Sequence, residues 1–268
     1  MKRRLLFVLV LLMLIAATVV ASLGSRRGEV SLASLRQLWS DTIRDIDQPG
    51  LRLTRLSAAE EMQLGANVLN SVSWPEDPVA AARVERIAQP MLPHVHRTDI
   101  QYHFHVVQAG MINAFALPGG QVLVTDGMLA FVQSDDELAE VVGHEMSHVD
   151  LRHCVEHYQY QYRLGSLVEL FHRLAAMPYS SDQELDADAE GMRLAIAGGY
   201  NPAAGPVLFE RMQKEMHESA GSPATTPAGE LAHSLGEALA SYFRSHPPSA
   251  ERARRLRGLA RSAHGAGG

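Results

Sequence analysis

The chain has 268 residues, 46% hydrophobic and 20% charged, so it can bury a sizeable core, and its composition excludes a disordered or collagen-like protein. Its single cysteine excludes both an internal disulfide framework and a cysteine-rich zinc module. The net charge of −6 argues against nucleic acid as a partner. The 13 histidines raise the question of a metal site, because neutral imidazole is the commonest metal ligand.

The amino terminus has the pattern of an export segment. Three basic residues at positions 2–4 precede an uncharged, mostly apolar run over residues 5–25, which ends at Arg26 and Arg27. A basic start, an apolar stretch and a small-residue site near Ala21 are typical of a cleaved secretory signal, and the same run is long enough for a single transmembrane anchor. Both alternatives stay open over residues 1–28, and both predict that the rest of the chain is exported.

After a lead-in over residues 29–56, local signals predict a mixture of helices and strands. Three capping boxes, in which a Ser and a Glu three residues later satisfy each other's backbone N–H groups, mark helix starts at Ser57 with Glu60, Ser134 with Glu137, and Ser181 with Glu184. The expected elements are helices over 57–70, 78–91, from 134 past 148, and 181–198, strands over 102–107, 111–117 and 121–125, and a helix after Pro247-Pro248. The pattern predicts one α+β domain over residues 57–260, followed by a flexible tail over 261–268.

The segment His144-Glu145-Met146-Ser147-His148 lies within the helix predicted to begin at Ser134. Histidines at positions i and i+4 lie one above the other on a helix face, so both imidazoles can bind one metal ion. Glu145 is rotated by about 100° from His144 and can act on a water beside the metal without binding the metal itself. Two surface histidines are the alternative, but a capped helix with an apolar face favours a catalytic zinc site.

A catalytic zinc needs a third protein ligand, and Glu184-Leu185-Asp186-Ala187-Asp188 is the obvious source. Glu184 and Asp188 share one face of the third capped helix. Glu184 could bind the metal while Asp188 accepts a hydrogen bond from a ligating imidazole. The alternative is that these acidic residues only complement the dipole in the first turn of the helix.

Together these motifs resemble the zinc metallopeptidases of the family that includes HtpX, the CAAX prenyl proteases and the mitochondrial Oma-type proteases. The other matching segments are Asn113-Ala114-Phe115-Ala116-Leu117-Pro118-Gly119-Gly120, Arg152-His153 and Ser245-His246-Pro247-Pro248-Ser249-Ala250-Glu251-Arg252. The resemblance covers residues from about 57 to 257, in the family's order. Because only one hydrophobic span is present, it fits the soluble or singly anchored bacterial branch and departs from the multi-pass members.

The resemblance implies a gluzincin-type fold, mainly helical, with a small sheet whose edge strand lines the metal cleft. The implied site residues are His144, His148 and Glu184 as ligands of one zinc ion per chain, Glu145, His246 and Arg252 as catalytic groups, and Asn113, Ala114 and Phe115 as substrate-binding residues. Asp188 would support a ligand from behind. His246 has two possible roles: it stabilises the oxyanion, or it occupies the open zinc position until substrate displaces it.

The expected function is that of a zinc metalloendopeptidase cleaving misfolded or damaged cell-envelope proteins, in the periplasm or at the periplasmic face of a bacterial membrane. Its partners would be unfolded or misassembled polypeptides, and the membrane if the amino-terminal segment is uncleaved. Two alternatives are a chaperone-like or binding module on the same fold and a zinc hydrolase of a small cell-wall substrate. The intact motif argues against the first, and the expected edge strand favours a polypeptide over the second.

The remaining histidines are not assigned to a second metal site. His94, His96, His103 and His105 lie on or near the predicted strand without an acidic or cysteine neighbour in the sequence, so a solvated strand face explains them. His153, five residues after His148, is assigned to the surface or to packing.

Overall fold

The structure is a computed structural model that describes residues 56–71, 75–156, 179–221, 239–240, 242–248 and 250–266. The predicted signal or anchor over residues 1–28 lies outside these residues, as does the lead-in up to residue 55. Within the described ranges, no helix has both the length and the hydropathy needed to cross a bilayer.

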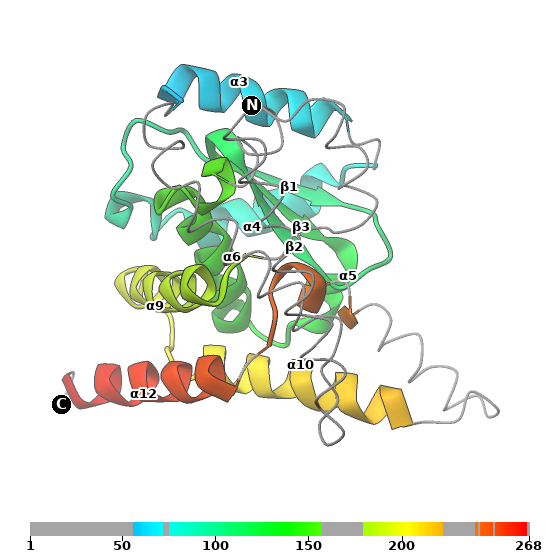
Figure 1. Ribbon diagram of the computed structural model, residues 1–268, viewed down its shortest axis with the longest axis vertical. Helices are drawn as coiled ribbons and strands as arrows, with labels where there is room; N and C mark the ends of the chain where they lie inside the picture. The colour runs from blue at the N-terminus through cyan, green and yellow to red at the C-terminus, as the bar shows by residue number, and fades with distance from the viewer. Residues whose placement is uncertain are drawn as a thin grey trace, which may run out of the picture.

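Helices surround a small sheet, which confirms the predicted mainly helical α+β fold (Figure 1). In chain order, the helices are α3 (Ala58–Ser71), α4 (Pro78–Ala88), α5 (Asp126–Phe131), α6 (Asp135–Asp150), α9 (Ser181–Ala197), α10 (Ala204–Gly221) and α12 (Ala250–Ala266), with 3-10 turns η1 (Leu92–His94) and η2 (Pro118–Gly120). The strands are β1 (His103–Val107), β2 (Ala114–Leu117) and β3 (Gln121–Thr125). Helix α12 therefore includes most of the segment 261–268 that the sequence analysis assigned to a tail.

The sheet has the order β1-β3-β2, so β3 is its central strand. β3 pairs in parallel with β1 and antiparallel with β2. The turn η2 between β2 and β3 contains Gly119 with a φ of 71°, a left-handed conformation that glycine adopts without strain. A Cβ atom there would lie 2.4 Å from the Cα atom of Met62, so α3 packs directly on this turn. Figure 1 shows α3 covering this end of the molecule.

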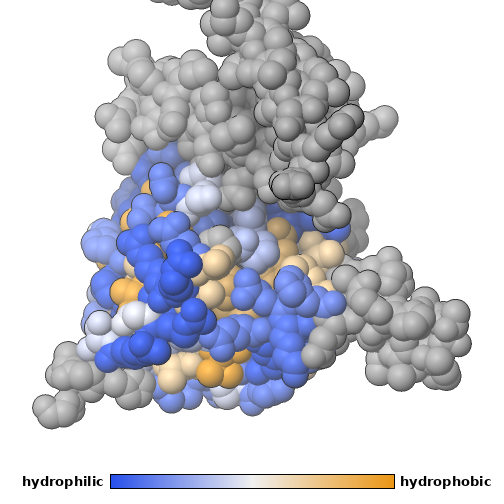
Figure 2. All heavy atoms as spheres, turned by 60° about the horizontal axis from the view of Figure 1, so that its bottom comes forward, coloured by the Kyte–Doolittle hydropathy of each residue, from blue (hydrophilic) through white to orange (hydrophobic). Residues whose placement is uncertain are grey.

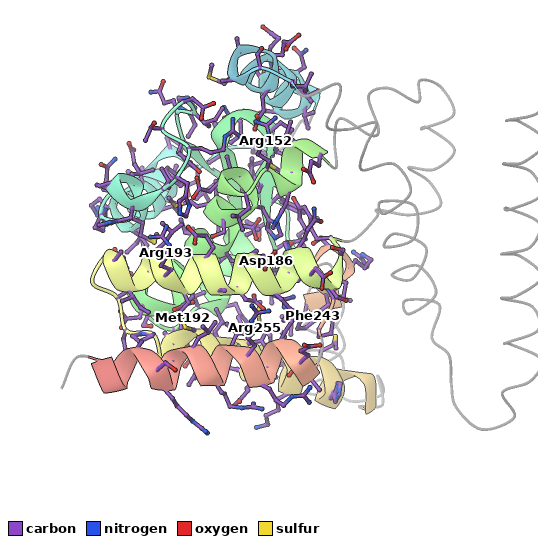
Figure 3. The ribbon with its side chains drawn as sticks, turned by 60° about the vertical axis from the view of Figure 1, so that its left-hand side comes forward. Arg152, Asp186, Met192, Arg193, Phe243 and Arg255 are labelled. Carbon is purple, nitrogen blue, oxygen red and sulfur yellow. The ribbon has the colours of Figure 1, made fainter. Side chains whose placement is uncertain are left out.

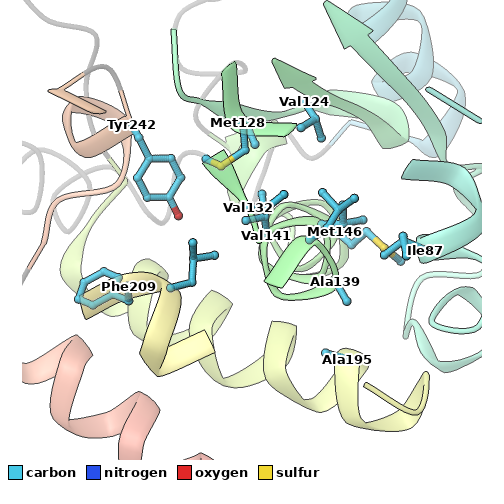
Figure 4. Packing of buried hydrophobic residues seen from close by; sticks show 14 of the residues in the cluster. Ile87, Val124, Met128, Val132, Ala139, Val141, Met146, Ala195, Phe209 and Tyr242 are labelled. Atoms are coloured by element: carbon cyan, nitrogen blue, oxygen red, sulfur yellow. The ribbon is translucent and has the colours of Figure 1, made fainter. Parts of the chain in front are cut away.

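Helix α6 lies at the centre of the hydrophobic core. Leu138, Val142 and Met146 are completely buried on it, between the sheet on one side and the carboxy-terminal helices on the other. Figure 4 shows Met146 directed towards Ile87 of α4. Burial on all sides removes apolar surface from water along the whole helix, which makes α6 a fixed support for the polar residues that it carries.

A glycine pair allows α6 and α9 to cross in close contact. A Cβ atom on Gly143 would lie 2.8 Å from the carbonyl oxygen of Gly191, and a Cβ atom on Gly191 would lie 2.8 Å from the backbone nitrogen of His144. Any larger side chain at either position would push the two backbones apart. The crossing point is next to the His-Glu-x-x-His segment, so this contact brings the acidic face of α9 to the histidines of α6.

Two of the three predicted helix starts have the expected cap. At α3, the Ser57 side chain accepts from the Glu60 amide at 3.3 Å, and the Glu60 carboxylate accepts from the Ser57 amide at 2.8 Å. At α6, Ser134 accepts from the Glu137 amide at 3.1 Å. The reciprocal half of this second box is absent, because the Glu137 carboxylate accepts from the Gln133 amide and pairs with Arg211.

The third predicted cap, Ser181 with Glu184, is wrong by one residue. Ser180 and Gln183 form the capping box of α9, and the helix begins at Ser181. The amide of Gln183 can serve the cap without burying a charge, which leaves the carboxylate of Glu184 to face α6. Glu184 is therefore available to interact with side chains of α6.

Helix α12 lies beside α9 and α10 (Figures 1 and 3). Its inner face carries the buried Arg252, while Arg254, Arg255 and Arg261 are exposed. Figure 2 shows hydrophilic residues gathered over the face that α12 and α10 form. The buried arginine is the exception on this helix, and its partners lie in the site described next.

Candidate metal centre

Three imidazoles and one carboxylate meet between α6, α9 and the segment 242–248. One ligand atom from each of His144, His148, Glu184 and His246 lies within 4.8 Å of all the others. All four residues are at most 6% exposed. The histidines of α6 are one turn apart, as their spacing predicted, and Glu184 comes from the first turn of α9.

The distances within the cluster match the dimensions of a zinc site. The Nε2 atoms of His144 and His148 are 3.1 Å apart. The Oε1 atom of Glu184 is 3.5 Å from Nε2 of His148, and its Oε2 atom is 3.6 Å from Nε2 of His144. Zinc–ligand bonds of about 2.0–2.1 Å in a tetrahedron place ligand atoms about 3.3 Å from one another. The two nitrogens and the carboxylate of Glu184 therefore fit one zinc ion.

Glu145 has the environment expected of a base beside a cation. It is 0% exposed, and although the backbone of Ala116 interacts with its carboxylate, neither oxygen has a partner at full hydrogen-bond geometry in the part of the chain that the structure describes. The Nε2 atom of His246 is 3.5 Å from its Oε1 atom. Burial raises the pKa of Glu145 above its usual value. A buried carboxylate without full hydrogen bonds is costly, so these oxygens suit a neighbouring metal and a substrate water.

His144 is supported from behind by a carboxylate, as the sequence predicted for Asp188. The Nδ1 atom of His144 is 3.1 Å from Oδ1 of Asp188. Arg252 donates two hydrogen bonds to Asp188, at 2.8 and 2.7 Å, and its Nη1 atom is 2.5 Å from Oε2 of Glu184. Arg252 thus holds the carboxylates of Asp188 and Glu184, which contact the histidines, and it also donates to the carbonyl of Pro247 at 3.1 Å.

His148 is supported by a residue that sequence reasoning missed. Its Nδ1 atom is 3.1 Å from Nδ1 of His153, so one ring donates and the other accepts. His153 is 7% exposed, which contradicts its assignment to the surface but agrees with packing. On the face of the His148 ring, Tyr179 stacks with its centroid 3.7 Å away and an interplanar angle of 13°.

His153 reaches His148 because the chain reverses after α6. The helix was expected to continue well past His148, but it ends at Asp150, and Arg152 follows with a φ of 65°. This left-handed conformation is unusual for a residue with a side chain. The Arg152 guanidinium is held by Glu61 of α3 at 3.3 Å and donates to the carbonyl of Leu56 at 3.2 Å. No short sequence signal indicates such a turn.

His246 lies against all the other members of the cluster. Its Nδ1 atom is 3.0 Å from Oε1 of Glu184 and 3.3 Å from Nε2 of His144. Tyr242 stacks on its ring with a centroid distance of 4.7 Å. The backbone amide of His246 donates to the carbonyl of Tyr242, which ends a helical turn just before Pro247. His246 therefore belongs to the group of side chains that could hold a metal ion.

The three residues predicted to bind substrate lie at the start of β2. This strand is at the edge of the sheet formed by the described residues, and α6 packs against it. Asn113 is 1% exposed, and its Oδ1 atom accepts from the amide of Ala114 at 2.8 Å. Ala114 is fully buried, whereas Phe115 is half-buried. The Asn113 side chain therefore shapes the strand start.

Electrostatics distinguish the cluster members. Burial alone would raise the pKa of Glu184, but the positive charge of Arg252 and hydrogen bonds with the histidines of α6 hold it well below its usual value. Burial lowers the pKa of His148 well below its usual value. For His144, burial also acts downwards, but the hydrogen bonds to Asp188 and Glu184 outweigh it and raise the pKa to about 10. The anionic Glu184 and neutral His148 are in the states that bind a metal.

A second group of polar side chains, His96 with Asp150 and Glu190, lies on the other side of the α6–α9 contact. The Nδ1 atom of His96 is 2.9 Å from Asp150 and 3.2 Å from Glu190, so this histidine does have acidic partners, unlike the sequence-based expectation. Asp150 also accepts from the amides of His96 and Arg97, and Glu190 pairs with Arg193 (labelled in Figure 3). These internal partners give the group the contacts of a salt-bridge network.

A mainly helical domain that gathers a His-Glu-x-x-His helix and a distant glutamate into one buried cluster is a zincin-type domain. Comparison with known families agrees: the model of peptidase family M48 matches residues 78–172 and 163–260. The chain therefore belongs to peptidase family M48.

Relatives of the chain are named as proteases or metalloproteases. The chain is 30% identical over 174 residues to the mitochondrial metalloendopeptidase OMA1 of Arabidopsis thaliana, covering 60% of this chain and 32% of that protein. It is 24% identical over 197 residues to the beta-barrel assembly-enhancing protease of Escherichia coli, covering 63% and 40%. It is 28% identical over 222 residues to the metalloprotease LoiP of the same organism, covering 75% and 76%. The chain spans about a third of the length of the first of these relatives and 40% of the length of the second.

Proposed function

We propose that this chain is a zinc metalloendopeptidase with one zinc ion bound by His144, His148 and Glu184. The observation that carries the proposal is the buried cluster of these three side chains, at distances that fit zinc, next to a Glu145 carboxylate without full hydrogen bonds. Membership of peptidase family M48 supports peptide bonds as the substrate.

The residues of the chain would act on the substrate in a simple order. A bound zinc ion supplies Lewis acidity, which polarises a carbonyl and makes water a better nucleophile at neutral pH. Glu145, whose pKa burial raises, takes the proton of the attacking water and returns it to the leaving amine. Asp188 and Arg252 would not touch the substrate: Asp188 orients His144, and Arg252 orients Glu184.

The substrate we propose is an unfolded or misassembled polypeptide of the cell envelope. An extended chain can add to the edge of a sheet through backbone hydrogen bonds, which recognise little sequence, and β2 is at the edge nearest α6. The relative named a beta-barrel assembly-enhancing protease is consistent with such a substrate. Residues 1–28 would be a signal peptide or an anchor that delivers the domain of residues 57–260 to the periplasm.

The test is metal content together with cleavage of casein by the purified chain. We expect one zinc per chain, cleavage that a chelator abolishes, and no cleavage by Glu145→Gln. Active protein without stoichiometric metal would overturn the proposal. Zinc binding without cleavage of casein would favour a chaperone-like module, and cleavage of muropeptides alone would favour a cell-wall hydrolase.

We further propose that His246 occupies the open zinc position until substrate displaces it, which would restrain an unspecific protease. Its Nδ1 atom lies among the three proposed ligands, at 3.0 Å from Glu184 and 3.3 Å from His144. The alternative, a donor to the oxyanion, is favoured by its Nε2 atom, which lies 3.5 Å from Glu145.

The variant His246→Ala separates these roles by the sign of its effect. A blocking role predicts faster casein cleavage than the parent protein. An oxyanion role predicts slower cleavage, by about two to four kcal/mol of barrier. An unchanged rate would remove His246 from the mechanism.

A further inference from the structure

A cavity lies beside the metal centre, between α6, α9, α10 and α12. Its wall includes His144 and the ion pair of Asp188 with Arg252, and apolar side chains such as Val141, Leu208 and Phe209 form most of the rest. Figure 4 shows Phe209 and Tyr242 on this side of α6, near Val141. The cavity has room for the centres of water molecules over about 40 Å³, which is enough for about three waters or for the end of one polar side chain.

The wall of this apolar cavity contains a buried carboxyl group, that of Glu140. The residue is 7% exposed, and its Oε1 atom has no hydrogen-bond partner among the residues that the structure describes. Burial, and secondarily the charge of Asp188, raise the pKa of Glu140 to about 8. A buried polar atom without a partner lowers stability, so a binding partner from outside would relieve that cost.

The start of α10 packs against the carboxyl group of Glu140. A Cβ atom on Gly205 would lie 2.8 Å from Oε2 of Glu140, so a residue with a side chain there would crowd the carboxylate. Among the described residues, the nearby cation Arg252 is paired with Asp188 and Glu184 and forms no ion pair with Glu140. No hydrogen bond or ion pair to either carboxylate oxygen of Glu140 is formed by the described residues.

These features select the chemistry of the ligand. Apolar walls suit a methylene stem, and a carboxyl group suits a cationic end. In a cavity this small, the compact ammonium of lysine is accommodated more readily than a planar guanidinium, whose fork spans both oxygens of a carboxylate. Glu140 precedes His144 by one helical turn, about 6 Å along α6, so a residue whose side chain fills the cavity has its backbone beside the metal centre.

We propose that this cavity is the subsite for a lysine side chain of the substrate next to the scissile bond, and that Glu140 is its specificity-determining residue. The inference rests on the proposed peptidase function. The subsite would make the peptidase prefer one side chain of the substrate, whereas pairing with the sheet edge recognises only the backbone of the substrate.

The test uses peptides that differ in one side chain. A fluorogenic peptide is cut by the full chain, the cut is located by mass spectrometry, and the residue on each side is replaced in turn by lysine or by norleucine, which has a similar stem without the charge. At one of these two positions, we expect kcat/KM to be at least tenfold higher for lysine. Glu140→Gln should abolish this preference, and Glu140→Leu should reverse it towards norleucine.

Two further measurements separate this inference from the proposed function. Glu85→Gln, at an exposed glutamate on α4, is the matched control and should keep the lysine preference. Binding of the same labelled peptides to Glu145→Gln, followed by fluorescence anisotropy, tests the subsite without cleavage. Equal affinity and equal kcat/KM for lysine and norleucine would overturn the inference while leaving the peptidase function intact. Absence of any cleavage would contradict the function, and the binding measurement would still decide on the subsite.

Discussion

The two histidines of α6 are held in place by different chemistry. His144 has the carboxylate of Asp188 behind it, with Arg252 fixing that carboxylate by two hydrogen bonds. His148 has the imidazole of His153 behind it and the ring of Tyr179 on its face. A carboxylate increases the basicity of the imidazole that it contacts, whereas a neutral imidazole mainly fixes orientation. The side of the centre at His144, the charged side, therefore depends on charge, and the side at His148, the packed side, depends on packing.

The largest effect should come from Glu184, which contacts both sides. Glu184→Gln removes the negative charge shared by the two histidines, so we expect zinc to be lost on dialysis and activity to be lost with it. Glu145→Gln should retain zinc and fold but lose at least about a hundredfold in rate, the low end for a general acid–base group. Metal analysis and casein cleavage on both variants check this. Reversed phenotypes would mean that base and ligand have been exchanged.

The second largest effect concerns the charged side of the centre, where Arg252 pairs with Asp188 and Glu184 beside His144. Arg252→Met leaves two buried carboxylates without their cation, which should cost about 3–5 kcal/mol in the free energy of unfolding. Arg257→Met is the matched control on the same helix, because Arg257 pairs with the half-exposed Glu210 and should cost less than about 1 kcal/mol. Urea denaturation of the metal-free proteins measures both. Equal losses for the two variants would show that burial of the Arg252 pairs is not what stabilises this side.

On the packed side, His153→Ala removes the hydrogen bond that orients His148. We expect zinc affinity to fall by about 10–100-fold, the usual effect of removing a hydrogen-bond partner of a ligand. Competition with a chromophoric chelator gives the affinity, and the spectrum of the cobalt-substituted protein reports the geometry. His103→Ala, at an exposed position of β1, is the control. Unchanged affinity and an unchanged spectrum would leave His153 as a packing residue only.

The sequence predicted the charged side far better than the packed side. His144, His148, Glu184 and Asp188 follow helical spacing, and i, i+4 positions share a face whatever the rest of the chain does. His153 could not be found in this way, because its place depends on the left-handed turn at Arg152 and on the contact of that arginine with Glu61, ninety-one residues earlier. The position of Glu140 against α10 likewise depends on how helices distant in the sequence pack.

The same reasoning explains the errors at the helix ends. The cap of α9 moved from Ser181 to Ser180 because serines stand at both positions and a glutamine and a glutamate both follow at the right spacing. The local sequence pattern fits both capping boxes equally well. Tertiary packing favours Ser180 with Gln183, because a box of Ser181 with Glu184 would take the Glu184 carboxylate away from two histidines and Arg252.

The smallest expected effect isolates the aromatic contact on the packed side. Tyr179 stacks on His148 at 3.7 Å, and its backbone amide donates to the carbonyl of Ser245, the residue before His246. Tyr179→Leu removes the stacked ring, and an aromatic pair contributes about 0.5–1.5 kcal/mol, so zinc affinity should fall by about two- to tenfold. Tyr179→Phe keeps the ring and should bind zinc like the parent protein. If the phenylalanine variant lost as much affinity as the leucine variant, the hydroxyl group and not the ring would support His148, and this side of the centre would depend on polar contacts as the other does.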